Sequence, residues 1–258
     1  MTSMRLFAWA LLACLAPMTG HAYKLTPEST AMRVPPASTA GQAVTIFVLD
    51  HRPYVTSGAK PETFEGVSRE LYGIPIDRDT NDDTRMADYL GRRLDIGFDR
   101  AGYAATYVPA PKTGQTEALL AAQPVPTGGW YFVVELRDWR YDFGGFRPSF
   151  KHDTEVRVFN AEGVLLAREI FDGMELMPQT SGWKSFKTRY AELYQNIFDK
   201  IFSAPAIAGG MAGTSTLPAS AQPETVETRL ARLRKLLEDG LINQDAHDRE
   251  QARILGEL

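Results

Sequence analysis

VTIFVL, at residues 44–49, is the stretch of sequence that decides the fold. Such a short and nearly continuous apolar run predicts a strand that is buried on both faces. Asp83 to Ala101 form an amphipathic helix, which Gly102 ends before a second strand at Ala105 to Val108. The apolar positions of this helix recur at helical spacing: Met86, Leu90, Leu94, Phe98 and Ala101. The order predicts a βαβ unit with a long first connection.

The next segments predict three antiparallel strands. Trp130 to Phe143 alternates apolar and polar residues, and its apolar parity changes between Leu136 and Trp139. A change of face within one run predicts either a bulge or an aromatic patch exposed on the outer side. Thr154 to Phe159 and Val164 to Phe171 follow, and the intervening NAEG favours a hairpin.

Helices complete the predicted domain. A short one is expected at Thr113 to Gln123, before the antiparallel strands. The last one carries a wide apolar stripe, typical of a helix packed against a sheet: Trp183, Phe186, Tyr190, Leu193, Ile197 and Ile201. The prediction is an α+β fold, an α/β sandwich in which the β-α-β unit is followed by a three-strand antiparallel meander and a C-terminal helix.

The first helix ends in DRAGY, residues 99–103. With this motif and this order of elements, the domain is similar to YajG-like bacterial envelope lipoproteins and related periplasmic assembly-factor domains. The resemblance implies an accessory role in the bacterial envelope.

Composition sets the boundaries of the predicted domain, at residues 43–203. Residues 23–42, rich in Pro, Ser, Thr and Ala, predict an extended leader. Residues 204–223, APAIAGGMAGTSTLPASAQP, are small and uncharged and predict a flexible linker that spans on the order of 25 Å. A tail without selected structure is the alternative for this linker.

Residues 1–22 predict a signal peptide. Arg5 supplies the positive charge, the apolar run that follows is too short to span a bilayer, and Gly20-His21-Ala22 offers a cleavage site. We expect an exported protein of the periplasm. Leu11 to Cys14 resembles a bacterial lipobox, so that Cys14 is a possible lipidation site. In that case the protein is anchored to an envelope membrane by its lipid only, whereas ordinary cleavage after Ala22 discards Cys14.

The C-terminal residues 224–258 predict two short amphipathic helices hinged at Gly240, tethered to the domain as a hairpin. A hairpin of this size buries too little apolar surface to be stable by itself, so its leucine face must pack on something. We expect a protein partner or a second copy to contact the following residues: Leu230, Leu233, Leu236, Leu237, Leu241, Ile242, Ile254 and Leu255.

This hairpin resembles the SHOCT (short C-terminal) domain family. The resemblance rests on L-x-x-L-x-x-L-L at Leu230 to Leu237, on D-G-L-I at Asp239 to Ile242, and on a polar helix that ends at Ile254-Leu255. The second helix departs from the family pattern, since Glu250 and Gln251 replace its paired lysines. The resemblance implies a module for oligomerisation or membrane-proximal assembly without catalysis of its own. The alternative is a helix pair folded back on the main domain.

Charge and composition exclude several classes of function. The formal net charge is −4, and the basic residues are scattered, which argues against nucleic acid or an anionic membrane surface as a partner. Cys14 is the only cysteine, so the chain forms no internal disulfide. The sequence lacks the familiar hydrolase, metalloprotease and nucleotide-binding motifs, and no cofactor, metal or enzymatic activity is predicted.

The best candidate for a ligand surface is the long connection from Asp50 to Asp83. Asp50, His51 and Arg52 follow the first strand, at the end where α/β folds often bind ligands. Trp139 and Tyr141, from the aromatic patch considered above, complete this candidate surface. A structural salt bridge at the strand end is the favoured interpretation of Asp50, His51 and Arg52, and acid–base chemistry with His51 is the alternative.

An acidic cluster lies in the same connection: Asp77, Asp79, Asp82 and Asp83. A solvated loop with helix capping by Thr80 or Asp82 is favoured over a cation site, because the spacing does not fit a calcium loop.

Two functions therefore compete. The first is a non-enzymatic envelope protein that associates with a protein partner or itself through the C-terminal hairpin. The second is a periplasmic small-molecule-binding or hydrolytic domain that uses the Asp50 to Arg52 strand end and the nearby loop.

Overall fold

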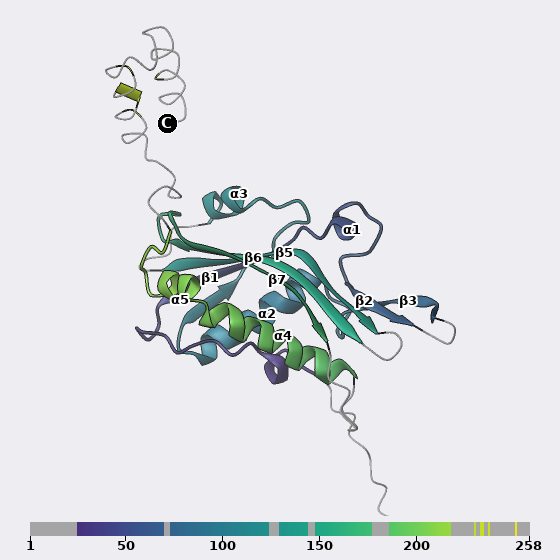
Figure 1. The fold of residues 1–258 in the computed structure, drawn as a ribbon. Helices are drawn as coiled ribbons and strands as arrows, with labels where there is room; N and C mark the ends of the chain where they lie inside the picture. The colour runs from purple at the N-terminus through teal and green to yellow at the C-terminus, as the bar shows by residue number, and fades with distance from the viewer. Residues whose placement is uncertain are drawn as a thin grey trace, which may run out of the picture.

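The computed structural model describes residues 25–69, 73–123, 129–143, 148–176 and 186–217, together with Leu230, Leu233, Arg234, Leu237 and Gln251, which are helical. Its elements, in chain order, are the 3-10 helix η1 (Glu28–Thr30), β1 (Ala43–Asp50), α1 (Pro53–Thr56), β2 (Phe64–Arg69), β3 (Pro75–Asp79), α2 (Met86–Arg100), β4 (Ala104–Tyr107), α3 (Thr116–Ala121), β5 (Trp130–Phe143), β6 (Ser149–Asn160), β7 (Leu165–Leu176), α4 (Phe186–Ser203) and α5 (Pro205–Met211). The fold is α+β, as predicted (Figure 1).

In the described part of the chain, strand β5 lies at the centre of a seven-stranded sheet. One of its edges pairs antiparallel with β6, which in turn pairs with β7, and this is the predicted meander. Its other edge pairs first with β1, from Val44↔Trp130 to Asp50↔Leu136, and then with β2, from Gly66↔Tyr141. Both pairings are parallel, and β1 pairs in parallel with β4 on its far side, so the predicted βαβ unit is confirmed.

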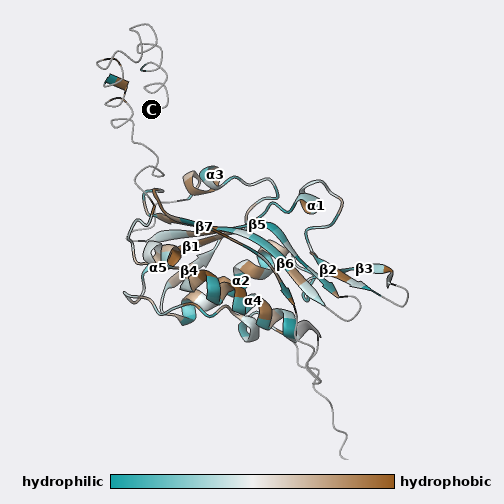
Figure 2. Cartoon of the chain, viewed as in Figure 1, coloured by the Kyte–Doolittle hydropathy of each residue, from teal (hydrophilic) through white to brown (hydrophobic). Residues whose placement is uncertain are grey.

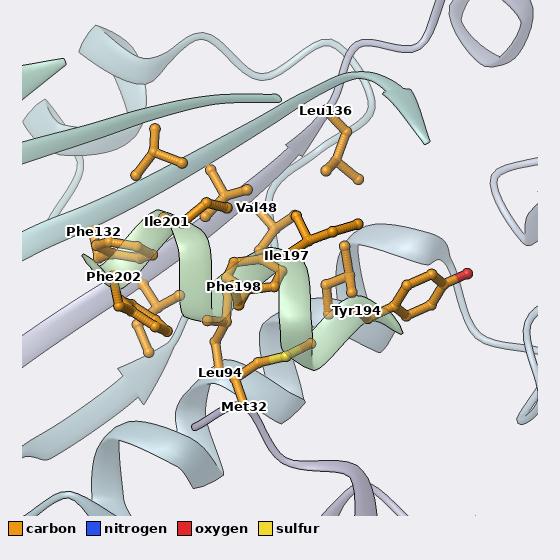
Figure 3. Packing of buried hydrophobic residues seen from close by; sticks show 14 of the residues in the cluster. Met32, Val48, Leu94, Phe132, Leu136, Tyr194, Ile197, Phe198, Ile201 and Phe202 are labelled. Carbon is orange, nitrogen blue, oxygen red and sulfur yellow. The ribbon is translucent and has the colours of Figure 1, made fainter. Parts of the chain in front are cut away.

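Helices α2 and α4 cover one face of the sheet, and their apolar residues form the main core with the strands. Figure 3 shows Ile197, Phe198 and Phe202 of α4 beside Val48 and Phe132 of the sheet. Along α4, hydrophobic and hydrophilic residues alternate at helical spacing (Figure 2), as the sequence pattern predicted. A smaller apolar cluster lies on the opposite face, where α3 contributes Leu119 and Leu120.

The change of parity in β5 is a bulge, because the register with β6 shifts between Leu136 and Asp138. The alternative, an exposed aromatic patch, is wrong. Trp139 has no exposed surface and Tyr141 is 4% exposed. Trp139 packs on Tyr194 of α4 at 5.0 Å between ring centroids, and Tyr141 stacks on Tyr190 at 4.1 Å. The bulge therefore keeps the apolar side chains of both halves on the helix-covered face.

The Asp50 to Asp83 connection is not a loop throughout, because it holds α1 and the antiparallel β2–β3 pair. Its sequence hides these strands, since both are short and polar and contain Gly66 and Pro75. Gly66 is required at its position, because a Cβ there would lie 2.5 Å from the carbonyl oxygen of Tyr141.

The predicted leader, residues 23–42, packs on the domain over its described part. Leu25, Ala31 and Met32 are buried, and the Met32 N–H donates to the carbonyl of Arg93 at 3.0 Å. The backbone of this extended segment makes its hydrogen bonds with α2 rather than with water. A segment held by its backbone needs few large apolar side chains, so its composition resembles that of a free segment.

The predicted linker, residues 204–223, is also wrong over its first part. Residues 205–211 form α5, which buries Ile207 completely and brings Gly210 against the sheet. A Cβ at Gly210 would lie 2.7 Å from that of Ala167, so only glycine permits this approach. The Thr216 N–H then donates to the Leu166 carbonyl at 2.9 Å. The domain thus continues to at least Leu217, and residues 218–223 lie outside the described residues.

Within the described residues, the helices are either too short or too polar to cross a membrane.

Ile207→Ala should lower the free energy of unfolding by about 2–4 kcal/mol, because it leaves a cavity where α5 meets the core. Urea unfolding followed by circular dichroism measures the loss. Ala208→Ser, at an exposed position of the same helix, is the control and should cost less than about 0.5 kcal/mol. Equal stability of the two variants would show that α5 adds nothing to the domain.

Candidate functional site

Arg52 is buried completely, at the point where the strand paired with β5 changes from β1 to β2. Its Nε and Nη2 donate to the two carboxylate oxygens of Asp50, each at 2.7 Å. Its Nη1 donates to the carbonyl oxygens of Phe64 at 2.7 Å and Trp139 at 3.1 Å. Burial opposes the charge, but the hydrogen bonds and charge of Asp50 outweigh it, so that the pKa of Arg52 is raised. The favoured prediction, a structural ion pair at the strand end, is confirmed.

His51 is held at both ring nitrogens. Nδ1 lies 3.0 Å from a carboxylate oxygen of Glu135, and Nε2 lies 2.9 Å from the carbonyl oxygen of Gly114. A general base needs a ring nitrogen that is free to accept a proton from a nucleophile or a water, and the carbonyl oxygen of Gly114 occupies Nε2. The predicted alternative of acid–base chemistry at His51 is therefore wrong for this arrangement.

The predicted ligand surface is mostly interior. Asp50, Arg52 and Trp139 are buried in the structure described above, which removes them as surface contacts. Tyr141 is also buried, although it counts among the residues that line the groove described below.

Three carboxylates of the acidic cluster each have a separate partner. Asp77 pairs with Lys60 at 2.5 Å, Asp79 accepts from Thr63 Oγ1 at 2.6 Å, and Asp82 accepts from Thr84 Oγ1 at 2.6 Å. Helix α2 starts without a side-chain cap, so the capping role predicted for Thr80 or Asp82 is wrong. Among the described residues, no group of three or more His, Cys, Asp and Glu side chains could hold a metal ion.

A groove of about 820 Å³ lies beside the β2–β3 pair, on the sheet face opposite α4. We call it the β2–β6 groove. Its lining combines aromatic or apolar side chains with four cations and two carboxylates: Tyr54, Lys60, Phe64, Val67, Arg69, Pro75, Asp77, Arg140, Tyr141, Asp142, Ser149, Lys151 and Met174. The cations exceed the carboxylates, although the whole chain is acidic.

Asp138 is shared by three donors from residues that line this groove. Arg140 approaches it at 3.4 Å, Lys151 at 3.1 Å, and the Tyr54 hydroxyl donates to it at 3.1 Å. Burial raises the pKa of Tyr54 to about 12, partly against the charge of Arg52, so its hydroxyl stays a donor at neutral pH. One carboxylate between two partly exposed cations leaves positive charge for an incoming anion.

The sequence did not indicate the groove cations. Arg140 and Asp142 alternate with Trp139 and Tyr141, which is the signal that places them on the opposite face of β5. Lys151 is brought beside Arg140 only by the pairing of β5 with β6. The face of the sheet on which these residues lie can be predicted only after the bulge in β5 has been recognised.

Comparisons with known proteins give no family. No protein-family model matches the chain, and no curated protein matches it. Several solved structures match parts of it, including the following three. A hypothetical protein of Chlamydia trachomatis is 14% identical with a TM-score of 0.37, over 68% of this chain and 100% of that one. An uncharacterised protein is 10% identical with a TM-score of 0.38, over 66% and 96%. The lipoprotein GNA1162 of Neisseria meningitidis is 12% identical with a TM-score of 0.28, over 62% and 97%. Likeness at this level assigns neither a family nor an activity.

Arg52→Met should lower the free energy of unfolding by about 3–5 kcal/mol, because it leaves the buried Asp50 carboxylate without its cation. The urea midpoint of the full chain measures this. Arg69→Met removes an ion pair with Asp142 whose partners are both about 40% exposed, and it should leave the midpoint nearly unchanged. Equal effects of the two substitutions would contradict the structural role of Arg52.

Proposed function

We propose that this chain is an exported, non-enzymatic protein of the bacterial envelope, which associates with a protein partner or with itself through its C-terminal hairpin. The export signal at residues 1–22 and the leucine pattern at residues 230–237 support the proposal. The lipid anchor at Cys14 and the SHOCT resemblance remain predictions. Cys14 lies outside the described residues, and so does most of the hairpin at residues 224–258.

The observation that carries the proposal is the conformation of three leucines. Leu230, Leu233 and Leu237 are helical, and their spacing of three and four residues puts them on one face of a helix. Leu233 is covered within the chain, at 7% exposed, whereas Leu230 and Leu237 on the same face keep part of their surface exposed. Arg234, the next residue, is exposed. An apolar helix face of this kind is a common docking element between proteins.

Leu233→Asp should abolish association without unfolding residues 43–217, because it puts a charge into the apolar face. Crosslinking and co-purification from the native envelope measure the association, and urea unfolding measures the domain. Arg234→Ser, one residue along on the exposed side, is the control and should keep the partners of the unaltered chain. If Leu233→Asp and a chain ended after Pro223 both keep those partners, the hairpin is passive and the proposal fails.

The β2–β6 groove supports a second candidate function, the binding of a small anion that carries an aromatic or aliphatic part. Phe64, Val67 and Met174 offer apolar contact, while Arg140 and Lys151 offer charge. Pockets that bind small molecules commonly combine an apolar lining with a few polar groups in this way.

Anilinonaphthalene sulfonate, an aromatic anion, is a suitable probe of this groove. Its fluorescence titration should show saturable binding that falls at least about tenfold in affinity when Arg140→Glu and Lys151→Glu are combined, because two attractions become repulsions. The matched control combines Arg92→Glu and Arg100→Glu, which change two exposed residues of α2. An equal loss in both double variants would show that the dye responds only to net charge.

A further inference from the structure

Strand β7 forms an edge of the sheet that is open in the described part of the chain. It pairs with β6 and with no other described strand, over a length of 12 residues. Its outer residues include Ile170, which is 47% exposed, Met174 and Leu176. Exposed apolar edge strands are sites where another strand adds to a sheet, and natural proteins usually protect them with charges, prolines or covering segments.

The hydrogen-bonding groups of the open edge belong to alternate residues. The Asn160 N–H donates to the Val164 carbonyl, so even-numbered residues of β6 direct their backbone groups toward β7. The pair Val158↔Ala167 then uses the backbone of Ala167, and the groups of Arg168, Ile170 and Asp172 point away from β6. The Thr216 N–H donates to the Leu166 carbonyl, which agrees with this assignment and closes the edge before Arg168.

The same three residues are complementary to themselves in an antiparallel pair. With Ile170 opposite Ile170 of a second copy, Arg168 of each chain lies opposite Asp172 of the other. Opposite charges in such positions are stabilising, and like charges are destabilising. Centring the pair on Arg168 or on Asp172 instead sets like charges against each other. The two intermediate registers set Ile170 against one of the charged residues.

Arg168 is already placed for this role. Its Nε and Nη2 donate to the two carboxylate oxygens of Glu155, at 2.7 Å and 2.9 Å, which orients the guanidinium on the outer face of the sheet. Its side chain keeps 54% of its surface exposed. The hydrogen bonds to Arg168 come first among the causes that lower the pKa of Glu155, so this carboxylate stays charged at neutral pH.

We propose that two copies of this chain pair antiparallel through residues 168–172 of β7, with Ile170 on the two-fold axis. The sheet then continues from one copy to the other, and the Arg168–Asp172 contacts on either side of the axis set the register. This interface goes beyond the association assigned to the C-terminal hairpin and does not depend on it.

The axis position provides a direct test by cysteine crosslinking. Cys14 is the only cysteine, so the full chain carrying Cys14→Ser and Ile170→Cys holds a single thiol. Residues facing each other in an antiparallel pair have Cα atoms about 5.5 Å apart, within the range a disulfide spans. Mild oxidation should give a crosslinked dimer. Val164→Cys, at an equally exposed position outside the paired segment, should not. Equal crosslinking at both positions, or none at Ile170→Cys, would overturn the proposal.

Charge reversal tests the register separately. Arg168→Asp and Asp172→Arg should each weaken self-association by at least about tenfold, because each places like charges on both sides of the axis. Mixing the two variants should restore dimers, since every contact in the mixed pair is again between opposite charges. Sedimentation velocity measures the species, and circular dichroism verifies the fold of each variant. Failure of the mixture to dimerise would contradict this register.

The hairpin variant Leu233→Asp separates this proposal from the proposed function. In that variant the Ile170→Cys crosslink should persist if β7 is an independent interface. Loss of the crosslink in Leu233→Asp would show that β7 pairing has no strength of its own, and it would overturn the inference while supporting the role of the hairpin.

Discussion

The buried pair of Arg52 and Asp50 is the interaction on which the arrangement of the sheet depends. Strand β5 is longer than either of its partners on one edge, so β1 must end and β2 must begin along its length. The junction exposes backbone carbonyls in an interior that water does not reach. A guanidinium can donate to several acceptors in one plane, and Arg52 uses that capacity on a carboxylate and on the carbonyls of Phe64 and Trp139. A lysine has the charge but not the planar fork of donors.

The bulge in β5, close to the same junction, decides which face of the sheet the following side chains occupy. Without it, the residues after Leu136 would present their aromatic side chains to the face that α4 does not cover. With it, Trp139 and Tyr141 join the core under α4, and Arg140 and Asp142 turn to the opposite face. The charged wall of the β2–β6 groove is therefore a consequence of the same irregularity that completes the core.

The parts of the fold that local periodicity encodes could be predicted from the sequence. VTIFVL, the stripe of α2 and the alternation of β5 each carry their signal within one segment. Strand β2 and helix α5 carry no such signal, because Gly66 and Gly210 are chosen for close approach to distant residues, Tyr141 and Ala167. The groove could not be predicted from the sequence either, because its cations come from separate strands and are brought together only by strand pairing. The position of His51 and Arg52 at a strand end could be predicted, but their partners Glu135, Gly114 and Trp139 lie far along the chain and decide that both residues are structural.

The shared edge of β5 also governs when this chain can fold. Strands β1 and β2 are made early, yet both wait for the same partner, which follows only after α2, β4 and α3. Pairings so distant in sequence close slowly, because the entropy of a long loop is lost before any contact compensates it. During that delay β1 has only β4 as a partner, so its other edge stays open. For the exported protein proposed above, such a delay favours passage across a membrane, because the newly made chain stays unfolded until β5 follows.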